Sequence, residues 1–241
     1  MLQIIYKRLL LSALLAFVLS ISIFAQSGNL PYVDQKFIHF GFSLGANTMD
    51  FGLTQSNDSI VVGNNKKVYS VGVTTLKPGF SVGIISDMRL NRYLNLRFTP
   101  TLHFSERQIT YKTTGFRDSI SITSIPVCIP LFLKYSAERK DNYRPYVIWG
   151  GGIALDLGRN TTTDMMLLKP LDFYTEFGVG CDIYFSFFKL APELKFAVGF
   201  NNLVTPIEQR VSGTITSENE FYTRALSKLT SRMLTLTFNF E

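Results

Sequence analysis

The stretch that decides the fold reads Leu94-Asn95-Leu96-Arg97-Phe98-Thr99-Pro100-Thr101-Leu102-His103-Phe104-Ser105. Apolar residues and one proline occupy every even position, and polar residues occupy every odd position. Successive side chains of a β-strand point to opposite faces of the sheet, so this period of two places all the apolar side chains on one face. Its length suits a tilted strand that crosses a membrane, which needs about 9–11 residues. The pattern therefore predicts a membrane strand with one apolar and one polar face.

The same alternation recurs along the chain, in residues 38–48, 77–87, 124–136, 144–156, 173–186, 194–201 and 234–240. The links between these stretches alternate in length. Short links lie near residues 88–92, 138–142 and 187–189, and long polar links lie near residues 54–70, 109–120, 158–170 and 204–224. Short periplasmic turns and long outer loops are typical of outer-membrane barrels. The sequence therefore predicts an all-β fold, an eight-stranded antiparallel up-and-down transmembrane β-barrel.

The composition of the polar face separates this prediction from a soluble barrel of the lipocalin type, whose apolar face would line a ligand cavity. The polar face is rich in Gly, Ser and Thr and poor in Lys and Glu, whereas a surface in water normally carries many charges. Aromatic residues should form two interfacial girdles. One would lie at the short links (Tyr93, Tyr135, Tyr143, Phe185, Phe187, Phe240) and one at the long links (Phe51, Tyr69, Tyr111, Phe173).

The N-terminus has the layout of a secretory signal. Lys7 and Arg8 precede an apolar stretch at 9–24, and the small residue Ala25 precedes a polar segment. This layout predicts a signal peptide at residues 1–25 and a barrel domain at 26–241, exported to the outer membrane. The alternative is an uncleaved anchor, for which the apolar stretch is short. An even number of strands would place both termini in the periplasm.

A few charged residues fall on the polar face and should meet in the lumen, where opposite charges neutralise one another. They are Arg97, Lys134, Asp156, Glu176, Asp182, Glu193 and Lys195. The simpler interpretation is a structural plug of ion pairs, because an eight-stranded barrel leaves room only for side chains or one small ligand. The alternative is a relay or selectivity site.

No motif indicates catalysis or a cofactor. His39 and His103 have no metal-ligand spacing to Cys128 or Cys181, and both cysteines are expected to be unpaired. A pair of His103 with Ser105 is conceivable, but no motif supports it. The glycines at 150–152 lie within a strand and lack the lysine of a phosphate-binding loop. The net charge of +6 is scattered, so no nucleic-acid partner is indicated. The sequence predicts a protein that is not an enzyme and holds no metal or cofactor.

The first predicted strand resembles a known family. His39-Phe40-Gly41-Phe42-Ser43-Leu44-Gly45-Ala46-Asn47, followed by Met49-Asp50-Phe51, is similar to the opening strand of the PorT family of Bacteroidetes outer-membrane proteins. Residues 30–36 resemble the mature N-terminus of that family. Residues 77–83, 94–100 and 125–135 fit as well, although the last two patterns are shared by Bacteroidetes outer-membrane barrels more widely.

The resemblance implies a role in the type IX secretion system, in which a separate and larger barrel carries folded cargo. PorT-like proteins have no known enzymatic activity, so the resemblance supplies no catalytic residues. The expected partners are outer-membrane lipid and proteins of the type IX translocon, and the oligomeric state stays open. Two alternatives remain, namely a surface adhesin or structural anchor, and an enzyme at the barrel rim that modifies lipid.

Overall fold

The computed structural model describes residues 29–55, 60–62, 65–67, 70–73, 77–113, 116–158, 167–205 and 226–241. The predicted signal peptide at residues 1–25 lies outside this part of the chain. A short 3-10 helix, η2 (Val33–Gln35), precedes the first strand. In the described residues, no helix has both the length and the apolar character needed to span a membrane.

The strands follow one another along the chain with almost no other secondary structure. Their bounds are β1 (Ile38–Gln55), β2 (Ile60–Val62), β3 (Asn65–Lys67), β4 (Ser70–Val73), β5 (Pro78–Arg89), β6 (Leu94–Phe98), β7 (Thr101–Thr113), β8 (Phe116–Ser124), β9 (Pro126–Ser136), β10 (Tyr143–Asp156), β11 (Leu171–Tyr184), β12 (Lys189–Gly199) and β13 (Leu226–Phe240). β2 and β3 form a separate hairpin.

The remaining strands close into a ring, because β1 pairs with β5 on one side and with β13 on the other. β6 and β7 pair with β5 in one register, as Ser86 opposite Phe98 and Phe80 opposite Phe104 show. They form one strand interrupted at Thr99-Pro100, where proline has no N–H to donate. β8 and β9 likewise pair with β7 in one register. The ring is therefore an eight-stranded antiparallel meander, and the predicted fold is confirmed.

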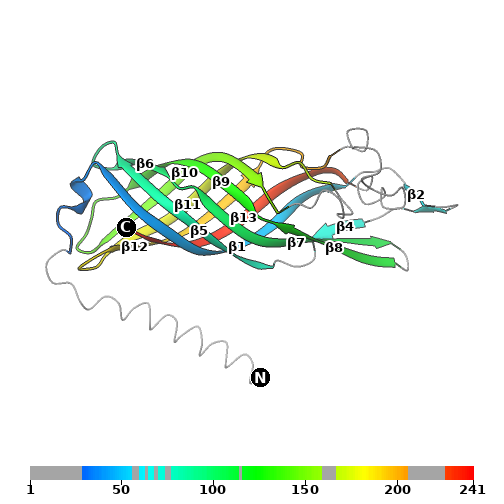
Figure 1. Ribbon diagram of the computed structural model, residues 1–241, viewed down its shortest axis with the longest axis horizontal. Helices are drawn as coiled ribbons and strands as arrows, with labels where there is room; N and C mark the ends of the chain where they lie inside the picture. Colours follow the sequence, from blue (N-terminus) through cyan, green and yellow to red (C-terminus); the bar gives the residue numbers. More distant parts are fainter. Residues whose placement is uncertain are drawn as a thin grey trace, which may run out of the picture.

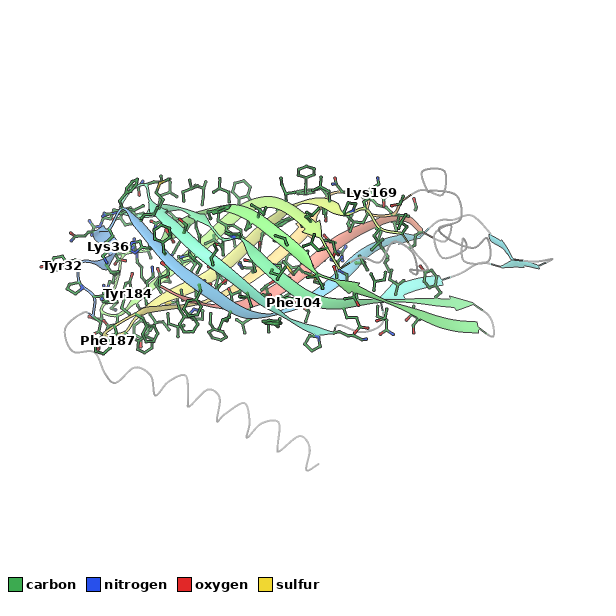
Figure 2. All side chains as sticks on the ribbon, viewed as in Figure 1. Tyr32, Lys36, Phe104, Lys169, Tyr184 and Phe187 are labelled. Carbon is green, nitrogen blue, oxygen red and sulfur yellow. The ribbon has the colours of Figure 1, made fainter. Side chains whose placement is uncertain are left out.

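The ring forms a long tilted barrel, with the first and last strands side by side (Figure 1). One end, here called the short-turn end, carries η2, the C-terminus and the short links after β5, β9 and β11. The opposite end is called the long-strand end. Here β7 and β8 run on together as a hairpin beyond most of the wall (Figure 1). Tyr184 and Phe187 lie at the short-turn end, and Lys169 lies at the other (Figure 2).

The two faces of the wall follow the predicted alternation. Phe98 and Phe196 are 42% and 48% exposed on the outside, while Arg97 and Lys195 are buried inside. Large exposed apolar side chains continue around the outer surface on β1, β5 and β9–β13. A band of apolar side chains around a barrel is the surface that contacts lipid.

Two features of the long-strand end differ from the prediction. The expected long link at 109–120 is largely a hairpin, since β7 ends at Thr113 and β8 begins at Phe116. Phe51 and Tyr111 were expected in an outer girdle, but both are buried in an apolar cluster inside the barrel. Their positions continue the inward alternation of β1 and β7, so the parity of the strand overrides the preference of aromatic residues for an interface.

The glycines in β10 allow close packing of neighbouring strands. Gly150 and Gly152 lie opposite β9. A Cβ atom at either position would collide with the backbone of β9, at Leu131 and Ile129 respectively. The run of three glycines at 150–152 therefore allows neighbouring strands of the barrel wall to pack closely, as glycine within a barrel strand commonly does.

Candidate functional site

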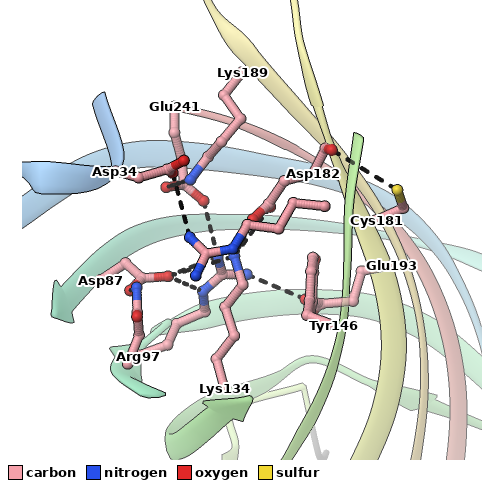
Figure 3. Close-up of polar contacts among 12 residues, drawn as sticks. Asp34, Asp87, Arg97, Lys134, Tyr146, Cys181, Asp182, Lys189, Glu193 and Glu241 are labelled. Atoms are coloured by element: carbon pink, nitrogen blue, oxygen red, sulfur yellow. Dashed lines mark hydrogen bonds and ion pairs between the residues drawn. The ribbon is translucent and has the colours of Figure 1, made fainter. Parts of the chain in front are cut away.

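The polar centre of the barrel is built around Arg97, which is 1% exposed. Its Nε lies 2.8 Å from Oδ2 of Asp87, on the neighbouring strand β5. Its Nη1 lies 3.1 Å from Oε2 of Glu193, and its Nη2 lies 2.9 Å from Oε1 of Glu241. One guanidinium thus contacts three carboxylates from β5, β12 and the C-terminal residue (Figure 3).

Two lysines extend this cluster toward the short-turn end. Lys134 on β9 lies 2.7 Å from Oδ2 of Asp182 on β11. Lys189, the first residue of β12, lies 2.7 Å from Oε2 of Glu241. The backbones of Lys189 and Glu241 also exchange two hydrogen bonds, so the ion pair reinforces a main-chain pairing.

A third lysine extends the cluster in the other direction. Lys195 Nζ lies 3.4 Å from Glu193 and 3.9 Å from Glu176. The hydroxyl of Tyr146 donates to Oε2 of Glu193 over 2.7 Å, and its ring lies 4.0 Å from Nζ of Lys134. Tyr146 reaches this position because Gly180 stands opposite it on β11. A Cβ at Gly180 would lie 2.5 Å from the tyrosine ring.

The structure brings six of the seven predicted residues into this one cluster, namely Arg97, Lys134, Glu176, Asp182, Glu193 and Lys195. Asp156 lies apart, toward the long-strand end. It accepts hydrogen bonds from the backbone of Ile125 and Gly158 and from the hydroxyl of Ser124, and its nearest cation is Arg107 at 4.0 Å.

Sequence reasoning missed four members, which are Asp87, Tyr146, Lys189 and Glu241. Asp87 and Tyr146 fall on inward positions of predicted strands, so the alternation could have identified them. Lys189 falls in the predicted short link at 187–189, and Glu241 follows the last predicted strand at 234–240, so the alternation assigned neither residue to the lumen. Lys189 is the first residue of β12 and Glu241 directly follows β13, and both side chains are buried in the lumen.

The structure places His103 beside a different serine from the one in the conceivable pair with Ser105. His103 Nδ1 lies 2.8 Å from the hydroxyl of Ser81, on the neighbouring strand, and not beside Ser105. Cys128 is buried in the lumen and Cys181 lies on the other face of the wall, and both are free thiols. Among the described residues, no group of three or more His, Cys, Asp or Glu side chains could hold a metal ion.

The segment that contains η2 covers the short-turn end of the lumen. Asp34 accepts a hydrogen bond from the hydroxyl of Tyr184 over 2.7 Å and lies 3.4 Å from Arg144 and 3.8 Å from Arg139. Asn29 is held by the backbone of Tyr184 and by the side chain of Asn142. The lumen is thus occupied by ion pairs and capped at this end by a chain segment.

The short turns themselves are polar. The hydroxyl of Tyr93 donates to Oε1 of Glu138 over 2.9 Å, and this hydrogen bond raises the pKa of Tyr93. Glu138 also lies 3.0 Å from Arg92, and both side chains of this pair are well exposed. Arg89, Arg92, Arg139 and Arg144 line a groove here together with Asp34 and Glu138.

Residues 24–205 match the family model described as the outer membrane protein beta-barrel domain. The chain belongs to this family. As a member of it, the barrel is an outer-membrane protein, and the band of exposed apolar side chains is its lipid-facing surface. A comparison with curated proteins gave no match.

Two solved structures are similar to this barrel. One is the crystal structure of Neisserial surface protein A, with 12% identity and a TM-score of 0.40, over 85% of this chain and 98% of that one. The other is the solid-state NMR structure of the outer membrane protein AlkL in lipid bilayers, with 13% identity and a TM-score of 0.40, over 90% of this chain and 97% of that one.

Proposed function

We propose that this outer-membrane barrel is a non-enzymatic component of the type IX secretion system that acts by contact with proteins of the translocon. The observation that carries the proposal is the occupied lumen, where Arg97 contacts three carboxylates. An eight-stranded barrel filled in this way has no room for cargo. The barrel would therefore act through contacts made by its outer surfaces. The resemblance of residues 39–51 to the PorT family supports the type IX secretion system as the setting of those contacts.

We further propose that the short-turn end faces the periplasm, with both termini of the mature chain, and that the long-strand end faces the exterior. Short periplasmic turns and long outer extensions are the usual arrangement of such barrels. The mature protein would begin after Ala25. Protease added to intact cells should cut only at the long-strand end, and mass spectrometry of the outer-membrane form should place its N-terminus at Gln26. Cutting within residues 138–142 would show that the barrel has the opposite orientation.

The groove between the short turns is the best candidate for the contact surface. Arg139 and Arg144 lie near Asp34, and the exposed Arg92 is paired with Glu138. Among the described residues, the side chain of Arg89 contacts the carbonyl of Asn91 and has no carboxylate partner. This excess of arginine suits an acidic surface on a periplasmic partner, with electrostatic complementarity guiding the encounter.

A clean deletion in the source bacterium, followed by profiling of secreted proteins, tests the proposal. We expect cargo precursors to accumulate in the periplasm and wild-type protein to restore secretion. Arg92→Glu should restore it poorly, whereas Lys228→Glu, an exposed charge reversal at the opposite end, should restore it fully. Normal secretion in the deletion strain would rule the proposal out.

A surface adhesin is the second candidate, favoured by the β7–β8 hairpin that extends beyond the wall. Shortening this hairpin should abolish adhesion and leave secretion intact if the adhesin hypothesis is right.

The hypothesis of an enzyme at the barrel rim is tested by His103→Ala. Loss of secretion from that substitution alone, in an inserted and folded protein, would favour an enzyme.

A further inference from the structure

A second polar site lies in the lumen, nearer the long-strand end than the ion-pair cluster. Here a cavity of about 50 Å³, partly open, is lined by residues of β1, β7 and β9–β13, by residues 168–170 and by Leu203. Met49, Cys128, Ala197 and Met233 belong to a buried apolar cluster on one side of it. Leu168 and Leu203 belong to another cluster on the other side.

The cavity contains a buried cation that is poorly satisfied. Arg107 is 6% exposed, and its Nε has no hydrogen-bond partner among the described residues. Its Nη2 contacts the hydroxyl of Ser124 over 2.8 Å and the sulfur of Met49 over 3.5 Å. The guanidinium also lies 4.6 Å from the centre of the Phe51 ring. None of these partners carries a negative charge.

The comparison with Arg97 shows how incomplete this coordination is. Arg97 makes close ion pairs with three carboxylates, whereas the nearest carboxylate to Arg107 lies 4.0 Å away. That carboxylate, of Asp156, already accepts hydrogen bonds from two backbone amides and one hydroxyl. A buried guanidinium with free donors is costly unless an acceptor joins it.

A second buried polar group faces the same cavity. The hydroxyl of Tyr174 has no hydrogen-bond partner among the described residues, and Tyr174 is 7% exposed. The other acid of the lining, Asp172, accepts hydrogen bonds from the hydroxyl of Ser231 and the backbone of Asn201. The cavity therefore offers donors from Arg107 and Tyr174, while its acids are already engaged.

We infer that this cavity binds a small amphipathic monocarboxylate. The carboxylate would accept hydrogen bonds from Nε of Arg107 and from the Tyr174 hydroxyl, and the aliphatic chain would lie against the methionine, alanine and leucine side chains. The lining favours a single negative charge, because Arg107 is its buried cation and the carboxylates of Asp156 and Asp172 would repel a ligand of higher charge. Apolar walls with a few converging polar groups are typical of small-molecule sites. This site does not depend on the proposed role in secretion, so an experiment can reject either proposal without rejecting the other.

The test is binding of carboxyl-labelled propionate to the full-length protein in lipid nanodiscs, followed by the NMR shift of the carboxyl carbon. We expect saturable binding at one site above the partition into lipid, and a higher unfolding temperature. Octanoate has the same carboxylate with a chain too long for the cavity, and propanol has the short chain without the charge, so both should bind more weakly. Inorganic phosphate should not compete.

Two variants keep the result interpretable. Arg107→Gln should weaken propionate binding by about tenfold or more, since it removes a charged donor. Ala197→Leu should weaken it by filling the cavity while Arg107 stays in place, which covers the case in which Arg107→Gln does not fold. Lys228→Gln, an exposed change near the same end, should have no effect. Absence of saturable binding to the wild type would overturn the inference, as would equal binding of octanoate or propanol, or binding indifferent to both cavity variants.

Discussion

Arg97 Nη2 lies 2.9 Å from Oε1 of Glu241, so a residue of β6 is ion-paired with the last residue of the chain. Glu241 also binds Lys189 at 2.7 Å and exchanges backbone hydrogen bonds with it. The C-terminal residue is thus part of the lumenal cluster. Closure of the ring between β1 and β13 brings this residue into the barrel.

Arg97→Met should destabilise the barrel strongly. Methionine keeps much of the volume but leaves the carboxylates of Asp87, Glu193 and Glu241 without their shared cation, and breaking a buried pair costs about 3–5 kcal/mol. Denaturant unfolding in lipid vesicles measures the change. Adding Asp87→Asn should recover part of the loss, because it removes one of the unpaired charges. Arg92→Met in an exposed pair is the control and should change little. Equal effects of the two arginine substitutions would contradict this account of the lumen.

Glu241→Gln isolates the side chain of the C-terminal residue, because the backbone pairing with Lys189 is kept. We expect lower stability, since Arg97 and Lys189 each lose a carboxylate partner. Folding is followed by the gel mobility of unheated samples. Stability equal to that of the wild type would mean that Glu241 lies outside the cluster in the membrane.

Gly180→Ala should displace the ring of Tyr146, because the added methyl would lie 2.5 Å from it. The displaced hydroxyl would lose its hydrogen bond to Glu193. Overpacking of this kind costs about 1–3 kcal/mol. Gly180→Ala combined with Tyr146→Leu should be less destabilised than the sum of the single changes, since the clash is gone. Additive effects in the double-mutant cycle would show that the alanine methyl group at position 180 does not touch the ring of Tyr146.

Phe98→Arg should place a charge in the lipid, at a cost of roughly 2–4 kcal/mol if position 98 lies near the middle of the membrane. Phe98→Leu is the matched control and should be tolerated. A spin label at position 98 should be quenched by lipid-soluble reagents, and a label at position 97 should be protected from them. The opposite pattern would shift the register of β6 by one residue.

The alternation of the sequence was sufficient to predict the wall of the barrel, because side-chain direction in a strand depends only on parity. It placed Arg97 and Lys195 inside and Phe98 and Phe196 outside, as observed. Parity also explains Phe51 and Tyr111, which lie inside although their residue type and their closeness to the long links favour a girdle.

The contacts within the lumen depend on the stagger between neighbouring strands and on how the ring closes. The sequence of a single strand does not determine either of these. Glu193 meets Arg97 from a strand that lies far along the chain. Glu241 meets Lys189 through the pairing of β12 with β13, but it meets Arg97 only once β13 has joined β1. Asp156 has the right parity and sign but lies too far toward the long-strand end. A list of inward charges could therefore be predicted, whereas their pairing could not.

Conductance across planar bilayers tests the central claim, that the lumen is closed by ion pairs and the protein acts through its surfaces. Purified, folded barrel reconstituted at single-molecule density should give no steady current comparable to that of a porin, whose 16–18 strands leave an aqueous channel. The same preparation must show the gel mobility of a folded barrel, so that silence is not a failure of insertion. A large, stable and reproducible channel from the wild-type protein would contradict the closed lumen and the proposal built on it.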